Sequence, residues 1–276
     1  MSGGAARRRC FRLNAITAGV ACTALVSASE AAAPSALPPC LARLAEAPTK
    51  EQLLCLKQLR NGGRAPASVA AVGALRNFLI LADGNTDHVS IASVLDALRS
   101  MGSGAAPAAE TLSGLLSHRS MLYNERDKML VVRLRAYIFV TLSEIGFPAS
   151  ALPALLDALA HVDERLTVVE IAAAARAAGS LESAGRQFAP FLLEALAVRL
   201  SAEEFSLERY EPQFPPEEAT TVQLEIVRAL ARICSPNDQQ ALEVLRDLGT
   251  DRGRGLDPRL VGEARHALEV ILRRPG

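Results

Sequence analysis

The sequence of 276 residues contains no tryptophan, and its 8 Phe and 3 Tyr are few for a chain in which half the residues are apolar. The apolar core must therefore be built mainly from Leu, Ala and Val. β-Branched residues are scattered among Ala, Leu, Glu and Arg, which are good helix formers, so little of the chain is typical of a strand. These features predict an all-α protein.

The chain also has no surplus of either charge, since Lys and Arg total 30 and Asp and Glu total 30. Proteins that bind nucleic acid usually carry a basic surplus, because they gain affinity by neutralising phosphates. The balanced charge therefore argues against a nucleic-acid partner. Arginine supplies almost all of the positive charge, and lysine occurs only at positions 50, 57 and 128.

Motifs that carry chemistry are absent as well. No two of the four histidines are three or four residues apart, and none has metal-ligand types close by in a zinc-like spacing. The sequence lacks Gly-x-Ser-x-Gly, and no strand precedes its short glycine pairs, which we interpret as helix ends rather than phosphate loops. We expect no catalytic residue, no metal ligand and no cofactor. The four histidines, expected on exposed helix faces or at helix ends, are His88, His118, His161 and His266.

The N-terminus has the three-part layout of a secretory signal peptide. Four arginines between positions 7 and 12 precede the uncharged residues 13–28, and Ala31–Ala33 supplies small residues for cleavage. We expect residues 1–33 to be removed and the mature chain, 34–276, to be exported to the periplasm or the cell exterior. The uncharged stretch is short for a bilayer, which needs about 20 apolar residues, so no stable membrane span is expected after processing. The alternatives are an uncleaved anchor and an amphipathic first helix.

Details of the export route stay open. Arg8-Arg9-Cys10-Phe11 partly matches the twin-arginine export signal, although basic runs of this kind also occur in ordinary secretory signals. Cys22 matches a lipid-attachment site poorly, because Gly19 stands where a branched apolar residue is expected. Cleavage after Ala33 would remove four Arg and Glu30, which leaves 26 basic and 29 acidic residues and a formal charge of −3.

Cysteine is scarce, and only Cys40, Cys55 and Cys234 would remain in the mature chain. Cys40 begins one short helical segment and Cys55 lies inside the next, so two helices joined by a short turn can bring both sulfurs together. An exported protein would oxidise such a pair. We therefore predict a Cys40–Cys55 disulfide, with two separate buried thiols as the alternative, and a core position for Cys234.

A short phrase occurs twice in the sequence. Residues 153–160, PALLDALA, recur 37 residues later as residues 190–197, PFLLEALA, and a helical segment that stops at a glycine precedes each copy. Self-similarity at this period is typical of stacked helical hairpins, each of which buries its apolar face against its neighbours. The sequence therefore predicts an α-solenoid of about five stacked hairpins.

Caps and glycines divide the chain into helices that follow one another in pairs. Asp87, Asp163 and Asp257 are expected to cap helices, and Thr220 and Ser235 are expected to open two more. Glycines at 102, 146 and 179 are expected to end helices. After a lead-in over 34–49, the expected helices cover 50–60, 66–81, 88–101, 107–117, 128–145, 149–160, 165–178, 185–200, 221–234, 236–248 and 258–273.

The spacing of apolar residues indicates half-buried helices. In the segment 128–145 one stripe is formed by Val131, Leu134, Ile138, Leu142 and Ile145. Arg133, Tyr137 and Glu144 fall on the other side and are expected to be exposed. In the last helix the expected stripe is Leu260, Ala264, Ala267, Leu268 and Ile271, with His266 and Glu269 facing away.

Residues 257–268, DPRLVGEARHAL, resemble the second helix of a HEAT repeat, particularly its short PBS-lyase-like form. Val261 stands where that family has its arginine. Segments 87–102 and 163–179 resemble looser copies, and the resemblance extends over most of 50–273. It implies an α-solenoid that serves as a scaffold or adaptor, since most of the family binds proteins. The iron-binding HEAT enzymes use repeated His-Glu dipeptides, and this sequence has none.

Residues 201–219 interrupt the repeats with three prolines, six Glu and one Arg. Insertions in repeat proteins fall on loops, and aromatic residues beside acids favour contact with a partner. The candidate contact residues are Phe205, Glu208, Tyr210 and Phe214. The alternative is a tethering insert whose aromatic side chains pack under a neighbouring repeat.

Together these features predict a non-enzymatic, exported scaffold or adaptor that binds an unidentified protein through its concave helix face or through residues 201–219. One alternative is an accessory subunit of an exported enzyme or redox protein. Another is an enzyme or lyase subunit of the bilin-lyase HEAT class, for which only the fold argues.

Overall fold

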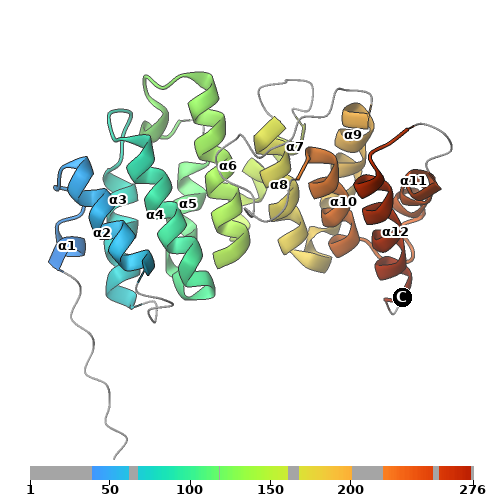
Figure 1. Ribbon diagram of the computed structural model, residues 1–276, viewed down its shortest axis with the longest axis horizontal. Coiled ribbons are helices and arrows are strands. Elements are labelled where there is room, and N and C mark those ends of the chain that lie inside the picture. Colours follow the sequence, from blue (N-terminus) through green and yellow to red (C-terminus); the bar gives the residue numbers. More distant parts are fainter. Residues whose placement is uncertain are drawn as a thin grey trace, which may run out of the picture. The chain divides into compact units, whose positions relative to one another are not determined.

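The computed structural model describes residues 39–61, 68–117, 119–160, 168–200, 220–250 and 255–274. Every regular element within these ranges is a helix (Figure 1). Residues 36–276 form one compact unit, and one continuous apolar core extends from Leu41 to Ile271. The predicted all-α class is confirmed.

Helices of the first layer lie side by side in chain order, and each contacts the next (Figure 1). A short helix, α1 (Pro39–Ala42), packs against the beginning of this layer. The layer consists of α2 (Thr49–Asn61), α4 (His88–Met101), α6 (Lys128–Ile145), α8 (Val168–Ser180), α10 (Val222–Ile233) and α12 (Pro258–Leu272).

The intervening helices form a second layer. Each of the last three packs against the first-layer helix that follows it, so α7 contacts α8, α9 contacts α10, and α11 contacts α12. The layer consists of α3 (Val69–Leu81), α5 (Ala109–Leu115), α7 (Leu152–Ala160), α9 (Ala189–Leu200) and α11 (Gln239–Thr250). Counted from α2, the described chain has five two-helix repeats followed by α12, which is the stacked arrangement that the sequence predicts.

Three second-layer helices begin with a 3-10 segment that the sequence does not predict. These segments are η1 (Gly102–Ala108), η3 (Ala149–Ala151) and η5 (Glu182–Phe188), and they precede α5, α7 and α9. Because η1 contacts both α4 and α6, and η5 both α8 and α10, these two segments occupy the space between successive first-layer helices, whereas η3 contacts α5 and α7 of the second layer.

Most of the predicted helix starts and stops are found where expected. The carboxylates of Asp87 and Asp257 accept hydrogen bonds from the amides of Val89 and Arg259. Gly102 and Gly146 end their helices with positive φ angles of 56° and 120°, a conformation that glycine adopts without strain. Asp163 lies outside the described residues.

The predicted helix caps at Thr220 and Ser235 are wrong. Thr221, not Thr220, caps α10 by accepting the Leu224 amide, while the hydroxyl of Thr220 donates to Glu225. Helix α11 begins at Gln239 rather than at Pro236. Asp238 accepts hydrogen bonds from both the amide and the hydroxyl of Ser235, which holds residues 235–238 in a turn before the helix.

The central helices α6 and α8 are buried on nearly all sides, because neighbours on both sides and the second layer cover them. The expectation that Tyr137 is exposed is therefore wrong, since its side chain is buried against the core. The predicted stripe of α12 is correct in Leu260, Ala264, Ala267 and Ile271, all of which are buried.

The sequence predicts that Gly179 ends a helix, but this residue lies inside α8 and is buried. A β-carbon at this position would be 3.1 Å from the Cα of Ala229 on α10. The glycine therefore allows α8 and α10 to approach closely, as small residues do at helix crossings. This crossing forms the floor of the site described next.

Candidate functional site

The contact residues predicted in the insert, Phe205, Glu208, Tyr210 and Phe214, lie outside the described residues, as do the predicted signal peptide 1–33 and Cys22. None of the described helices is both long enough and apolar enough to cross a membrane.

Two of the four histidines, His118 and His161, also lie outside the described residues, and the other two, His88 and His266, are exposed on helices. In the described ranges no three His, Cys, Asp or Glu side chains are grouped so that they could hold a metal ion.

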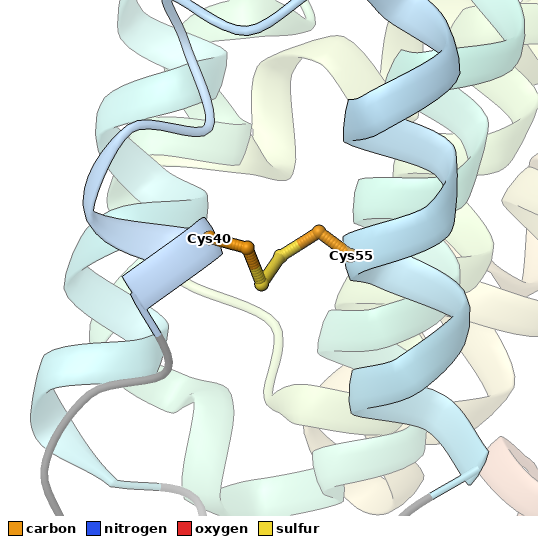
Figure 2. The surroundings of a disulfide bond; sticks show 2 residues. All are labelled: Cys40 and Cys55. Carbon is orange, nitrogen blue, oxygen red and sulfur yellow. A yellow bond between two sulfur atoms is a disulfide. The ribbon is translucent and has the colours of Figure 1, made fainter.

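Cys40 on α1 and Cys55 on α2 are joined by a disulfide bond (Figure 2). Their Cα atoms are 5.8 Å apart, and 15 residues separate them in the sequence. Cys55 is buried, so the bond attaches α1 to the apolar side of the first repeat. The remaining described thiol, Cys234, is buried, and burial raises its pKa to about 12, so it carries little thiolate at neutral pH.

A charged groove lies where α8, α10 and α12 pack side by side. Its floor is the close crossing at Gly179 and Ala229, and it contains a cavity of about 380 Å³. Three successive first-layer helices supply its walls. The charged or titratable residues that line this cavity are Arg176, Glu225, Arg228, Arg232, Glu263 and His266.

A second cavity of about 590 Å³ adjoins the first at the C-terminal ends of α8 and α10, where both cavities are lined by Gly179 and Arg232. We call the two cavities together the arginine groove. The second cavity adds the side chains of Ser180, Glu182, Ser183, Arg186, Ile233, Cys234, Ser235 and Arg274.

Several of the groove arginines are held in place. Arg228 lies between Glu225 and Glu263, with nitrogen–oxygen distances of 3.3 and 3.6 Å. The Nη1 of Arg274 donates to the backbone carbonyl of Cys234 at 2.6 Å. Since a guanidinium has five N–H donors in a fixed fork, these contacts orient both side chains, and Arg274 keeps donors for a further acceptor.

Arg186 is fixed by a forked pair with Asp238. Its Nε and Nη2 lie 3.0 and 2.7 Å from Asp238 Oδ1. Partial burial would raise the pKa of Asp238, but the hydrogen bonds from Ser235 and Arg186 outweigh it and hold the pKa below its usual value. The pair therefore stays ionised at any pH near neutrality.

Arg232 differs from the other groove arginines. Within the described part of the chain, its guanidinium makes no hydrogen bond and no ion pair, and the side chain is exposed. Its Cδ lies 3.5 Å from the position that a β-carbon on Gly179 would take, so the stem passes over the glycine. The structure thus places an uncommitted positive group between the two cavities.

Sequence reasoning missed this site because its residues come from α8, η5, α10 and α12. Arg228 and Arg232 are four residues apart and therefore share a face of α10, which is a local signal. The balanced charge of the chain as a whole hides that signal. Arg186 and Arg274 come into the groove only when the helices stack.

A buried ion pair was missed as well. Arg135 on α6 is 1% exposed, and its Nε lies 2.5 Å from Glu170 Oε1 on α8. Its Nη1 donates to the carbonyl of Leu116 at the end of α5, and its Nη2 lies 3.6 Å from Asp157 on α7. Arg135 thereby connects three successive repeats, which makes it a structural rather than a ligand-binding residue.

No protein-family model matches the chain, and a search of curated proteins finds no match. The crystal structure of an engineered protein is similar to it, with a TM-score of 0.48 and 22% sequence identity, over 84% of this chain and 96% of the engineered one.

Proposed function

We propose that the protein is an exported, non-enzymatic scaffold or adaptor of the HEAT-repeat type that acts by binding another protein. The observation that carries this proposal is the arginine groove, in which three stacked helices hold side chains of both signs along one surface. Helices that are fixed by a common core lose little conformational entropy on binding, so such a surface is suited to recognition.

Membership in the HEAT family is supported by the order of the elements. Paired helices alternate between two layers, and the segment that carries the HEAT-like Asp-Pro motif forms the capped start of α12. Arg135, buried on α6 and paired with Glu170 on α8, supplies an arginine contact between repeats elsewhere in the stack.

Export is supported by two independent features. The basic, uncharged and small-residue segments of residues 1–33 match a signal peptide, and disulfides such as Cys40–Cys55 persist mainly in oxidising compartments. Processing after Ala33 would give a mature chain that begins at Pro34.

The experiment is an affinity capture of the processed protein from an envelope extract after mild cross-linking, with mass spectrometry of the bait and of the captured proteins. We expect a bait that begins at Pro34 and one reproducible exported partner. An unprocessed bait with only cytosolic partners would contradict both export and the scaffold.

Two variants show which surface is used. Arg232→Gln alters the arginine groove, and replacing Phe205, Tyr210 and Phe214 by Ser alters the insert. The surface whose variant loses the partner is the binding surface. Capture of a known enzyme as the sole partner would identify the protein as an accessory subunit.

A further inference from the structure

We infer that the arginine groove binds an acidic, extended peptide segment of the partner protein, with Arg232 as the anchor for one of its carboxylates. This inference rests on the proposed function, for which it names the chemistry of the partner. It starts from Arg232, whose exposed guanidinium makes no ion pair within the described residues and separates two cavities of about 380 and 590 Å³.

A carboxylate fits this position because a guanidinium donates two parallel hydrogen bonds to it. Arg274 can bind a second carboxylate, and both Arg274 and Arg228 are already oriented. Arg274 is oriented by the carbonyl of Cys234, and Arg228 by Glu225 and Glu263. Their orientation is set before binding, so a ligand does not have to order them.

The size of the groove indicates a short extended segment. Along α10 the lining residues extend from Glu225 to Ile233, and eight residues of α-helix rise about 12 Å. An extended peptide advances about 3.3 Å per residue, so about four ligand residues match that length. A single small anion would fill only part of either cavity.

The carboxylates in the groove select against a uniformly charged polyanion. Glu182, Glu225 and Glu263 stand among the arginines, and they would repel a ligand with a negative charge at every position. A peptide in which acidic residues alternate with small polar ones can place its carboxylates beside Arg232 and Arg274 and keep neutral residues next to the glutamates. This pattern favours an acidic peptide over nucleic acid or polyphosphate.

The test is a fluorescence-anisotropy titration of the full processed chain with a labelled heptapeptide of alternating Glu and Ser. The matched probe has Gln in place of every Glu. We expect saturable binding of the Glu peptide and binding of the Gln peptide that is at least about tenfold weaker, because a charged hydrogen bond contributes more than a neutral one. The absence of saturable binding of the Glu peptide up to millimolar concentration would overturn the inference.

Arg232→Gln should lower the affinity for the Glu peptide by about tenfold. The matched control is Arg246→Gln, which removes the same charge from an exposed position on α11 outside the groove, and it should change the affinity less than twofold. Equal losses in the two variants would mean non-specific attraction and would overturn the inference. Both variants should keep the melting temperature of the parent, since both side chains are exposed.

Inorganic phosphate separates a peptide site from a general anion site. At equal ionic strength, phosphate should displace the Glu peptide no better than chloride does. Displacement of the peptide by phosphate at low millimolar concentration would contradict the peptide assignment. The two proposals can fail separately. If the Arg232→Gln variant still captures the partner, the scaffold proposal holds and the groove is not its binding surface. If the peptide binds but no partner is captured, the groove inference holds and the scaffold proposal is unsupported.

Discussion

Arg135 on α6 and Glu170 on α8 form a buried ion pair, in which the arginine side chain is 1% exposed and the glutamate side chain 7%. Removing two charges from water is costly, and this cost is offset only when hydrogen bonds satisfy the remaining donors. The carbonyl of Leu116 and the carboxylate of Asp157 provide these further contacts. The pair therefore depends on three repeats being assembled together.

Glu170→Ala should lower the free energy of unfolding by about 3 kcal/mol, because it leaves the Arg135 charge buried with only distant compensation from Asp157. Thermal and urea unfolding followed by circular dichroism would measure the effect. Glu243→Ala, at an exposed position on α11, is the control and should change stability by less than about 0.5 kcal/mol. A loss in Glu170→Ala no larger than in this control would show that the pair is not buried in solution. The double replacement Arg135→Met with Glu170→Leu should recover most of the loss.

Gly179→Ala should destabilise the protein by about 1–3 kcal/mol, because the added methyl group would lie 3.1 Å from the backbone of Ala229 and would force α8 away from α10. The matched control is Gly262→Ala on α12, where a β-carbon meets nothing within 4 Å. That control should be neutral or stabilise the helix by up to about 1 kcal/mol. Melting temperatures of the two variants check both signs, and a neutral Gly179→Ala would mean that the crossing is looser than described.

The processed protein should contain one free thiol. Intact-mass measurement after alkylation in denaturant should show one label, on Cys234, without reductant and three labels after reduction. Three labels without reductant would show that Cys40 and Cys55 are not bridged. Replacing both cysteines by serine should lower stability by about 3 kcal/mol, since a loop of about 15 residues is no longer closed in the unfolded chain.

The Asp238–Arg186 pair predicts a specific dependence on pH. Because the folded-state pKa of Asp238 lies below the usual 3.8, the ionised carboxylate stabilises the fold above that value, and this contribution is lost as the pH falls through the folded pKa. Asp238→Asn should therefore be less stable than the parent by a constant amount between pH 5 and 7. The difference should shrink below pH 3.8, as measured by urea unfolding at each pH. A difference that grows on acidification would contradict the pKa shift.

The sequence predicted the helices and their order well because caps and glycine stops are local signals. Asp87, Gly102 and Gly146 act through bonds and angles within a few residues, and no distant contact competes with them. The 3-10 segments η1 and η5 are not predicted by the sequence, since they fill the gaps between first-layer helices and depend on how the repeats stack.

Sequence periodicity fails where a helix has no exposed face. Apolar periodicity does not predict the burial of Tyr137 and Arg135, because a stripe of apolar residues indicates one buried side, whereas α6 is covered by α4, α8 and α5. The burial of Arg135 can be predicted from the sequence only if its partner is known to lie on the next helix. That partner, Glu170, is 35 residues further along the chain.

The arginine groove could not be predicted from the sequence for the same reason. Arg176, Arg232, Arg186 and Arg274 are scattered over about 100 residues, and only the register between α8, α10 and α12 brings them to one surface. The insert at 201–219 is recognisable from its composition and the groove is not, so the two are separate candidates for the binding surface.

The disulfide has a consequence for how the stack loses its structure. Among the described helices of the first layer, α2 and α12 are the two ends, since α2 contacts only α4 and α12 only α10. The first repeat is therefore held from one side and is prone to fray. The Cys40–Cys55 bond acts there as an end clamp. Reduction should therefore unravel the array from this end inward, with amide exchange accelerating first in α1 and α2 and last in the doubly flanked α8.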